Sequence, residues 1–113
     1  MNFSIKSWMI AMKSYIILVS KGALSDLDGI AQYVSSLHRP ESGHKYVNKI
    51  LGRLASLSFT ANIFQTSRFA IAKEIHPMAK TMSIINHSWT VIFHTTDDNV
   101  IIDRIIPSKM TVR

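Results

Sequence analysis

The chain has 113 residues and carries 13 Lys and Arg against 7 Asp and Glu, a formal net charge of +6. Only 18% of the residues are charged and 47% are hydrophobic, which excludes a disordered basic tail and predicts one globular domain over residues 1–113. The absence of cysteine excludes disulfides and thiolate metal sites. A cationic surface favours a polyanion or an acidic protein as partner.

The start of the chain fits neither a strand nor a capped helix, and we treat residues 1–11 as a dispensable extension. Lys6, Lys13 and Ser14 interrupt the apolar run in this region. The pattern therefore predicts neither a secretion signal nor a membrane anchor. We expect a cytoplasmic protein that does not enter a membrane.

A strand and a helix are predicted next. Residues 15–19, YIILV, form the short β-branched run that is typical of a buried strand. Residues 23–37 carry apolar side chains at the three-and-four spacing of one helical face, and Ser20 or Ser25 is placed to cap this helix. Arg39-Pro40 ends it, because the residue before a proline avoids helical geometry.

A second helix is predicted over residues 42–57, with Ser42 as its cap. Its apolar stripe is Tyr46, Val47, Ile50, Leu51, Leu54 and Leu57. Beside the stripe, Lys45, Lys49 and Arg53 recur every fourth residue and form a cationic ridge. The ridge is either a solvated helix face or a contact for a polyanionic target. The short linker between the two helices predicts an antiparallel helical hairpin.

The rest of the chain is predicted to be mainly strand. Residues 58–67 are expected to form an irregular connection, and residues 69–72 and 82–85 are strand candidates. His76-Pro77 separates these two candidates, since proline does not sit inside a central strand.

A β-hairpin is the strongest local pattern. Residues 89–96 and 100–106 are rich in branched and aromatic side chains, and residues 97–99 between them have turn chemistry. Asp97 and Asp98 are therefore turn formers in this interpretation, not a pair of catalytic carboxylates.

This order of elements predicts an α+β fold. An N-terminal strand and an antiparallel helical hairpin pack on one face of a small, mainly antiparallel sheet of three to four further strands. Trp89, Val91 and Phe93 alternate toward one face, which we expect to meet the helices. His94 then points to the opposite face.

No metal motif joins the five histidines, because neither HxH nor HxxxH spacing occurs among them. They are His38, His44, His76, His87 and His94. We expect no metal and no cofactor. A histidine beside cationic residues can act as an acid or base on an RNA backbone, which makes His87 and His94 candidate catalytic residues.

Three further cations lie in or after the hairpin. Arg104 interrupts an apolar strand, so it lies at the rim of the sheet or pairs with another element. Lys109 and Arg113 follow Pro107, which ends strand pairing, and are free to reach a polyanion.

Three short segments resemble the RelE/ParE superfamily of toxins from bacterial type II toxin-antitoxin systems. ALSDLDGIAQYV, residues 23–34, resembles the family's first helix. WTVIFHTTDDNVIIDRII, residues 89–106, is similar to its final hairpin. IIDRIIPSKM resembles the ending of the ParE branch, with Arg104 at the position of that branch's strand arginine. Together the segments place almost the whole chain on the family's order of elements.

The resemblance implies a toxin that inhibits growth, contributes to plasmid stabilisation and is neutralised by a bound antitoxin. RelE-like members cut messenger RNA on the ribosome with basic side chains on the sheet and an arginine and an aromatic residue near the C-terminus. ParE-like members lack that set and are associated with DNA gyrase. The toxin is expected as a homodimer or in a toxin-antitoxin hetero-oligomer.

Matched residue by residue, the chain departs from both branches. The RelE-type arginine after the leading aromatic falls on Thr90, and the paired lysines of the preceding strand fall near Thr81 and Ser83. Lys109 matches the first residue of the terminal Lys-Arg pair, whereas Met110 replaces the arginine. In the ParE-type ending, Pro107 replaces a histidine and Met110 an arginine.

Three hypotheses follow. The first is a ParE-like or other non-nuclease toxin, because the basic set is missing. The second is a ribosome-dependent ribonuclease in which Lys80, His87 and Arg104 substitute for that set, since RNA cleavage needs a base, an acid and positive charge near the phosphate. The third is a degenerate protein kept for binding an antitoxin or nucleic acid. All three predict a neighbouring gene for a short antitoxin with an acidic tail.

Overall fold

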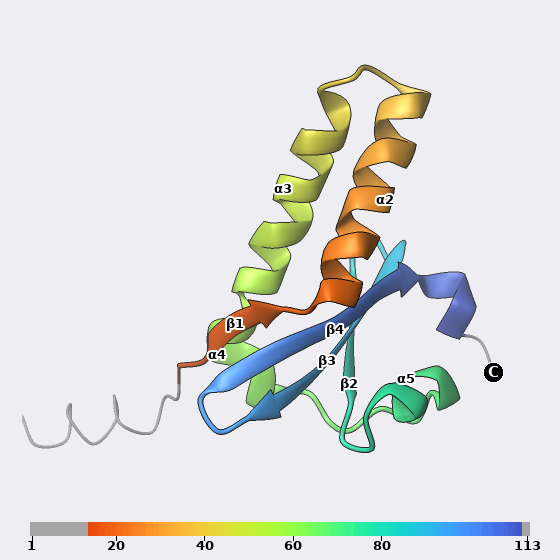
Figure 1. The fold of residues 1–113 in the computed structure, drawn as a ribbon. Helices are drawn as coiled ribbons and strands as arrows, with labels where there is room; N and C mark the ends of the chain where they lie inside the picture. The colour runs from red at the N-terminus through yellow and green to blue at the C-terminus, as the bar shows by residue number, and fades with distance from the viewer. Residues whose placement is uncertain (1–13, 112–113) are drawn as a thin grey trace, which may run out of the picture.

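The computed structural model describes residues 14–111, and Figure 1 shows a helical hairpin standing on a twisted sheet. The elements in chain order are β1 Ile16–Val19, α2 Lys21–Leu37, α3 Ser42–Ala55, α4 Leu57–Thr60, η1 Ala61–Ile63, α5 Ala70–Ile75, β2 Lys80–Ile84, β3 Trp89–Thr96, β4 Asn99–Pro107 and η2 Ser108–Thr111. The sheet order is β1-β4-β3-β2, in which β1 runs parallel to β4 and the other neighbours are antiparallel. The predicted α+β fold is confirmed. The extension expected at residues 1–11 lies outside the described residues.

α2 begins at Lys21 because Ser20 caps it. The Ser20 hydroxyl accepts a hydrogen bond from the N–H of Ala23 at 3.1 Å and donates one to the carbonyl oxygen of Asp103 at 3.0 Å. The helix therefore starts two residues before the predicted Ala23, and its start is tied to β4. It ends at Leu37, shortly before Pro40 as predicted.

α3 lies antiparallel to α2, as the short linker predicts (Figure 1). Its expected cap is wrong: Ser42 is the first helical residue, and its hydroxyl accepts from the N–H of Arg39 at 3.3 Å instead. The tip of the hairpin is held by Ser35, whose hydroxyl donates to the Pro40 carbonyl at 2.8 Å and accepts from the Gly43 N–H at 3.1 Å. Because of this contact the two backbones approach closely at Gly43.

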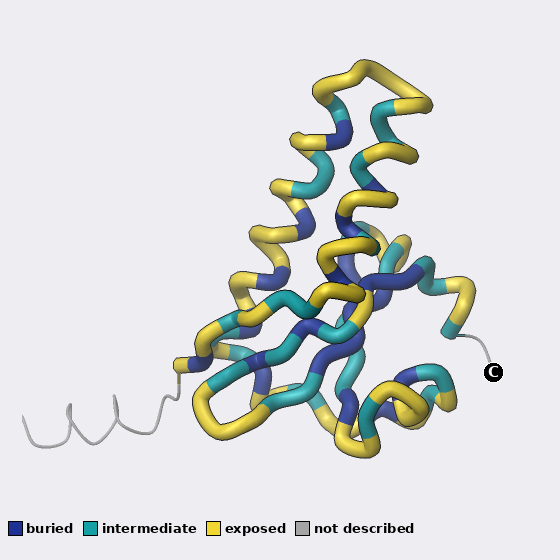
Figure 2. The backbone as a smooth tube through the Cα atoms, viewed as in Figure 1, coloured by how far each residue is buried: buried dark blue, intermediate teal, exposed yellow. Residues whose placement is uncertain are grey.

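The main core lies between the helical hairpin and one face of the sheet (Figure 2). Phe93 is fully buried there and meets Phe64 edge-on, with ring centroids 5.7 Å apart. Val91 is also fully buried in this core, and Trp89 packs against it. The expectation that the aromatic face of the hairpin meets the helices is confirmed.

The opposite face of the sheet has a cover that the sequence did not predict. The strand expected at residues 69–72 is wrong, because Ala70–Ile75 form helix α5. Ala72 and Ala79 pack there against Ile92, and all three are fully buried. Residues 58–67 are also more regular than expected, since α4 and η1 lie within or beside them.

Arg104 pairs with another element, the second of the two possibilities left open by the sequence. Its guanidinium donates to the Asp26 carboxylate of α2 from Nε at 2.8 Å and from Nη2 at 3.0 Å. The same carboxylate accepts from the N–H of Ile105 at 2.8 Å. The hydrogen bond to Asp26 raises the pKa of Arg104, so the contribution of the charged guanidinium to stability is present at neutral pH and is lost as the pH rises into strong alkali.

Replacing Asp26 by alanine is expected to lower the free energy of unfolding by about 2 kcal/mol, because Arg104 and the part-buried Ile105 N–H both lose their acceptor. Urea denaturation followed by circular dichroism measures the change. The control is Asp28→Ala, because the exposed Asp28 accepts a hydrogen bond from Gln32 on its own helix, at 2.9 Å. Equal losses in the two variants would contradict a special role for Asp26.

Candidate functional site

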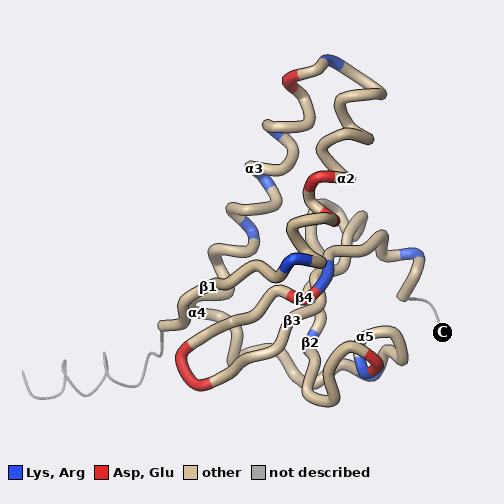
Figure 3. The backbone as a smooth tube through the Cα atoms, viewed as in Figure 1, with Lys and Arg blue, Asp and Glu red and all other residues tan. Residues whose placement is uncertain are grey.

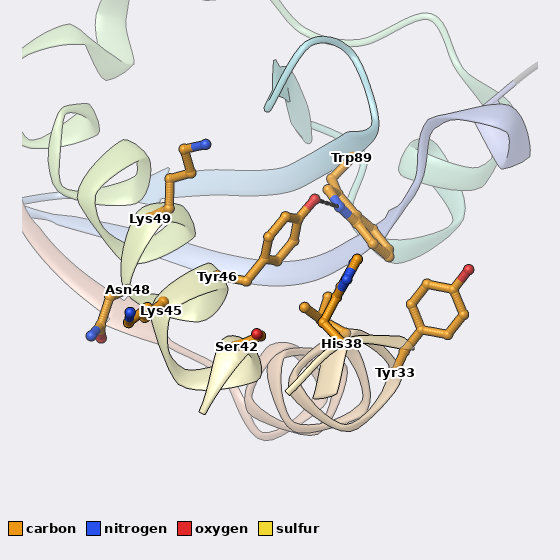
Figure 4. A pocket seen from close by; sticks show the side chains of 9 residues that line it. Tyr33, His38, Ser42, Lys45, Tyr46, Asn48, Lys49 and Trp89 are labelled. Atoms are coloured by element: carbon orange, nitrogen blue, oxygen red, sulfur yellow. Dashed lines mark hydrogen bonds between the residues drawn. The ribbon is translucent and has the colours of Figure 1, made fainter. Parts of the chain in front are cut away.

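A groove of about 800 Å³ opens between the helical hairpin and the start of β3 (Figure 4). We call it the aromatic groove. α2, α3 and β3 supply its lining residues, which are Tyr33, Val34, His38, Ser42, Lys45, Tyr46, Asn48, Lys49 and Trp89. The groove exists because the hairpin extends beyond the sheet, so that the sides of both helices there have no strand to cover them.

Three aromatic side chains define the groove. The indole N–H of Trp89 donates to the hydroxyl of Tyr46 at 2.8 Å, which fixes these two rings relative to each other. Tyr33, on α2, is 59% exposed. Rigid aromatic rings with polar tips are the side chains that most often anchor protein partners. The groove therefore has the character of a binding surface.

A second hollow of about 670 Å³ continues the groove past Trp89 toward the C-terminus. It shares the three aromatic residues and adds His87, Ser88, Pro107, Ser108 and Lys109. The turn before β3 shapes it, because Ile85, Asn86 and His87 all have positive φ, at 50°, 53° and 65°. Three such residues in succession are strained, and strained backbone is concentrated at functional sites.

The lysines that line the two hollows have no acidic counterpart in the described lining. Lys45 and Lys49 line the first hollow and Lys109 lines the second, whereas no carboxylate lines either hollow in the described part of the chain. Figure 3 shows Lys and Arg following α3. An apolar floor with a cationic margin attracts a partner that presents apolar side chains among acidic ones.

The structure brings several sequence candidates to this groove. His87 and Lys109 line the second hollow, and the ring of His87 hydrogen-bonds the Ser83 hydroxyl at 2.9 Å. Lys45 and Lys49 belong to the predicted ridge, and Arg53 continues it one turn along α3. Arg113 lies outside the described residues.

The other catalytic candidates lie elsewhere. Lys80 donates from Nζ to the carbonyl oxygen of Ala61 at 3.1 Å, which ties β2 to η1. His94 lies on the opposite face of the sheet, where Nδ1 is 2.7 Å from the Asp103 carboxylate and the ring stacks on His76 at 4.0 Å. Arg104 is also engaged, in its ion pair with Asp26. The candidate acid, base and cations therefore do not come together at one site.

Thr90, on which the sequence resemblance places the RelE-type arginine, has a structural role. It is 4% exposed, and its hydroxyl hydrogen-bonds that of Ser108 at 2.9 Å. This contact holds η2 against β3. An arginine at this position would have no solvent to reach without moving η2.

Among residues 14–111, no group of three or more His, Cys, Asp or Glu side chains is arranged to hold a metal ion. Within the same residues, no helix combines the length and the apolar character needed to cross a membrane.

The architecture defines a class: a small α+β protein in which a helical hairpin covers one face of a sheet whose N-terminal strand is parallel to the last one. A solved structure of the chromosomal ParDE TA system from P. aeruginosa contains a chain with this fold. The TM-score is 0.68 at 23% sequence identity, and the match covers 85% of this chain and 96% of that one. The predicted RelE/ParE-like fold is confirmed. No family model and no curated protein matches the chain.

Proposed function

We propose that this protein is the toxin of a bacterial type II toxin-antitoxin pair, of the ParE-like, non-nuclease kind. The observation that carries the proposal is the fold shared with a chain of a ParDE system over 96% of that chain. The toxin inhibits growth in the cytoplasm until a cognate antitoxin binds it.

The aromatic groove is the proposed binding site for the antitoxin. Its three rings offer apolar area, and Lys45, Lys49 and Lys109 surround them with positive charge. A short antitoxin with an acidic tail complements both features, because apolar anchors give affinity and opposite charge speeds association. The resulting complex is a toxin-antitoxin hetero-oligomer.

Growth on induction tests this function. Expression of the chain alone in a bacterial host is expected to stop growth, and co-expression of the product of the neighbouring gene is expected to restore it. Normal growth of cells that contain soluble protein and no antitoxin would refute a toxin and favour a degenerate binding protein.

The positions of the candidate catalytic residues support a toxin that is not a nuclease, because these residues do not gather at one site. Lys80 and Arg104 are held by Ala61 and Asp26, and Thr90 is buried where the RelE-type arginine would stand. DNA gyrase is then the proposed target. Purified toxin is expected to inhibit gyrase supercoiling at a modest molar excess. If the aromatic groove also contacts the target, the Trp89→Ala variant should inhibit supercoiling less. Full supercoiling at high excess would remove gyrase as the target.

One observation favours a ribonuclease as the second candidate. Asp103 lies 2.7 Å from Nδ1 of His94, an arrangement that orients an imidazole for proton transfer. A ribonuclease that uses this pair should cleave transcripts after induction, and His94→Gln should abolish cleavage in protein that circular dichroism shows to be folded. Intact transcripts in primer extension, which we expect from the proposed function, would exclude this candidate.

A further inference from the structure

α3 gathers positive charge more than any other element that the structure describes. Its cationic ridge, formed by Lys45, Lys49 and Arg53, is exposed. Every other helix or strand within residues 14–111 has at most one Lys or Arg, and α2, α5 and β4 also carry Asp or Glu. In Figure 3 no red position interrupts the blue ones along α3. The ridge is therefore the one cluster of like charge among these elements.

The ridge side chains have no acidic partner within residues 14–111. The ion pairs there join His94 to Asp103 and Arg104 to Asp26, and none includes a residue of the ridge. Cations four residues apart on a helix repel one another. An anion that binds along α3 would remove this repulsion, so the ridge is arranged for a ligand with several negative charges.

The rest of the ridge face is also polar. Asn48 and Gly52 lie between the cations and are exposed, whereas Ile50 and Leu54 are buried in the main core. Lysine, arginine and side-chain amides are the groups that most often contact a nucleic-acid backbone. A protein partner needs apolar or aromatic anchors, and the ridge face offers none. This composition favours a nucleic acid over an acidic protein.

We propose that the cationic ridge binds the sugar-phosphate backbone of duplex DNA. Its residues are four positions apart, which on an α-helix is about 6 Å, so the ridge spans about 12 Å. One strand of duplex DNA presents about three to four phosphates over that length of its axis. The helical hairpin stands clear of the sheet in Figure 1, which leaves the outer side of α3 open to a rod-like molecule.

Groove dimensions favour DNA over double-stranded RNA. The major groove of B-DNA is about 12 Å wide and admits an α-helix. The major groove of A-form RNA is too narrow for side chains to read. α3 can therefore lie along the rim of the DNA groove with phosphates within reach of the ridge. Contacts to phosphates carry no sequence information, so we expect the protein to bind DNA of any sequence.

The salt dependence of DNA binding by the purified protein tests the proposal. A fluorescein-labelled duplex of random sequence reports binding through its anisotropy. Three phosphate contacts should reduce the affinity about 40-fold between about 50 and about 200 mM KCl, because each contact releases a counterion. Arg53→Gln leaves two contacts, so its affinity should fall only about 12-fold over the same range.

Arg53 is the sharpest residue to change, because it lines neither hollow of the aromatic groove proposed for the antitoxin. The matched control is Lys73→Gln, which removes an exposed cation from α5 and should keep the 40-fold dependence. The assay contains neither antitoxin nor gyrase, so its result does not depend on whether the protein is a toxin.

Four results would overturn the proposal. They are no binding at about 50 mM KCl, the same salt dependence in Arg53→Gln as in Lys73→Gln, displacement of DNA by polyglutamate at equal charge, and tighter binding of duplex RNA. The second would assign binding to diffuse positive charge, the third would assign the ridge to an acidic protein and the fourth to RNA. If Arg53→Gln does not fold, as judged by circular dichroism, NMR of the unaltered protein decides, because DNA should shift the amide signals of residues 45–53 and not those of α5.

Discussion

Replacing Gly43 by alanine is expected to lower the free energy of unfolding by about 2–3 kcal/mol, because the added methyl group has no space. A Cβ at this position would lie 2.2 Å from the carbonyl oxygen of Ala31 and 2.4 Å from the hydroxyl oxygen of Ser35. The first of these atoms belongs to the backbone of α2, so it cannot rotate away. The two helices would have to separate at the tip of the hairpin, where the Ser35 hydroxyl joins them.

Thermal and urea denaturation of Gly43→Ala measure this loss, and Gly52→Ala is the matched control. Gly52 lies on the same helix, and a methyl group added there would meet no neighbouring atom within 4 Å. Alanine at Gly52 should therefore stabilise the protein by up to about 1 kcal/mol through helix propensity. Opposite signs for the two changes are the expected result. A Gly43→Ala protein as stable as the original would mean that the close approach of the helices is not essential.

The regular elements of this fold could be predicted from the sequence because their patterns are long. α2 and α3 each carry an apolar stripe, and β3 and β4 are runs of eight and nine residues rich in branched and aromatic side chains. The prediction for residues 69–72 failed for a physical reason. Four apolar residues do not distinguish a strand from a helix, and here Ala70 and Ala72, as strong helix formers, help start α5.

The site was only partly predictable, because it depends on contacts between distant residues. Charge alone predicts Lys45, Lys49 and Lys109 as contacts for a partner. In the structure Lys45 and Lys49 line the aromatic groove, and Lys109 lines the second hollow that continues it. The apolar patterns place Tyr46 and Trp89 in the core. Their indole-to-hydroxyl hydrogen bond joins residues 43 positions apart, and no local pattern predicts it. Tyr33 is absent from the predicted site, although an aromatic residue beside an apolar stripe is a usable signal.

For His94 and Arg104, too, the sequence did not identify the residues that they contact. Strand alternation placed His94 opposite the aromatic face, which the structure confirms. Alternation within one strand does not identify Asp103 as its partner, because that contact depends on the pairing of His94 with Ile101, two residues before Asp103 on the neighbouring strand. The partner of Arg104, Asp26, is 78 residues away. The charge of Arg104 within an apolar strand therefore pointed to an acidic partner but could not identify Asp26.

The antitoxin is expected to bind the Tyr33→Ala variant about 30-fold more weakly, because Tyr33 is the most exposed aromatic anchor of the groove. Its exposure also means that its removal should change stability by less than about 0.5 kcal/mol. Calorimetry with purified antitoxin measures the affinity. Leu24→Ala is the matched control on the same helix, since Leu24 is 54% exposed and lines neither hollow of the groove.

Charge reversal in Lys45→Glu and Lys49→Glu should act mainly on the association rate, with a difference that shrinks as salt is raised, because these ammonium groups lie at the margin of the groove. Tyr33→Ala should instead raise the dissociation rate. The two kinds of variant differ because, in the proposed binding site, the aromatic rings hold the bound antitoxin and the lysines attract it before binding. Unchanged binding in all three variants would place the antitoxin on another surface, even if the protein proves to be a toxin.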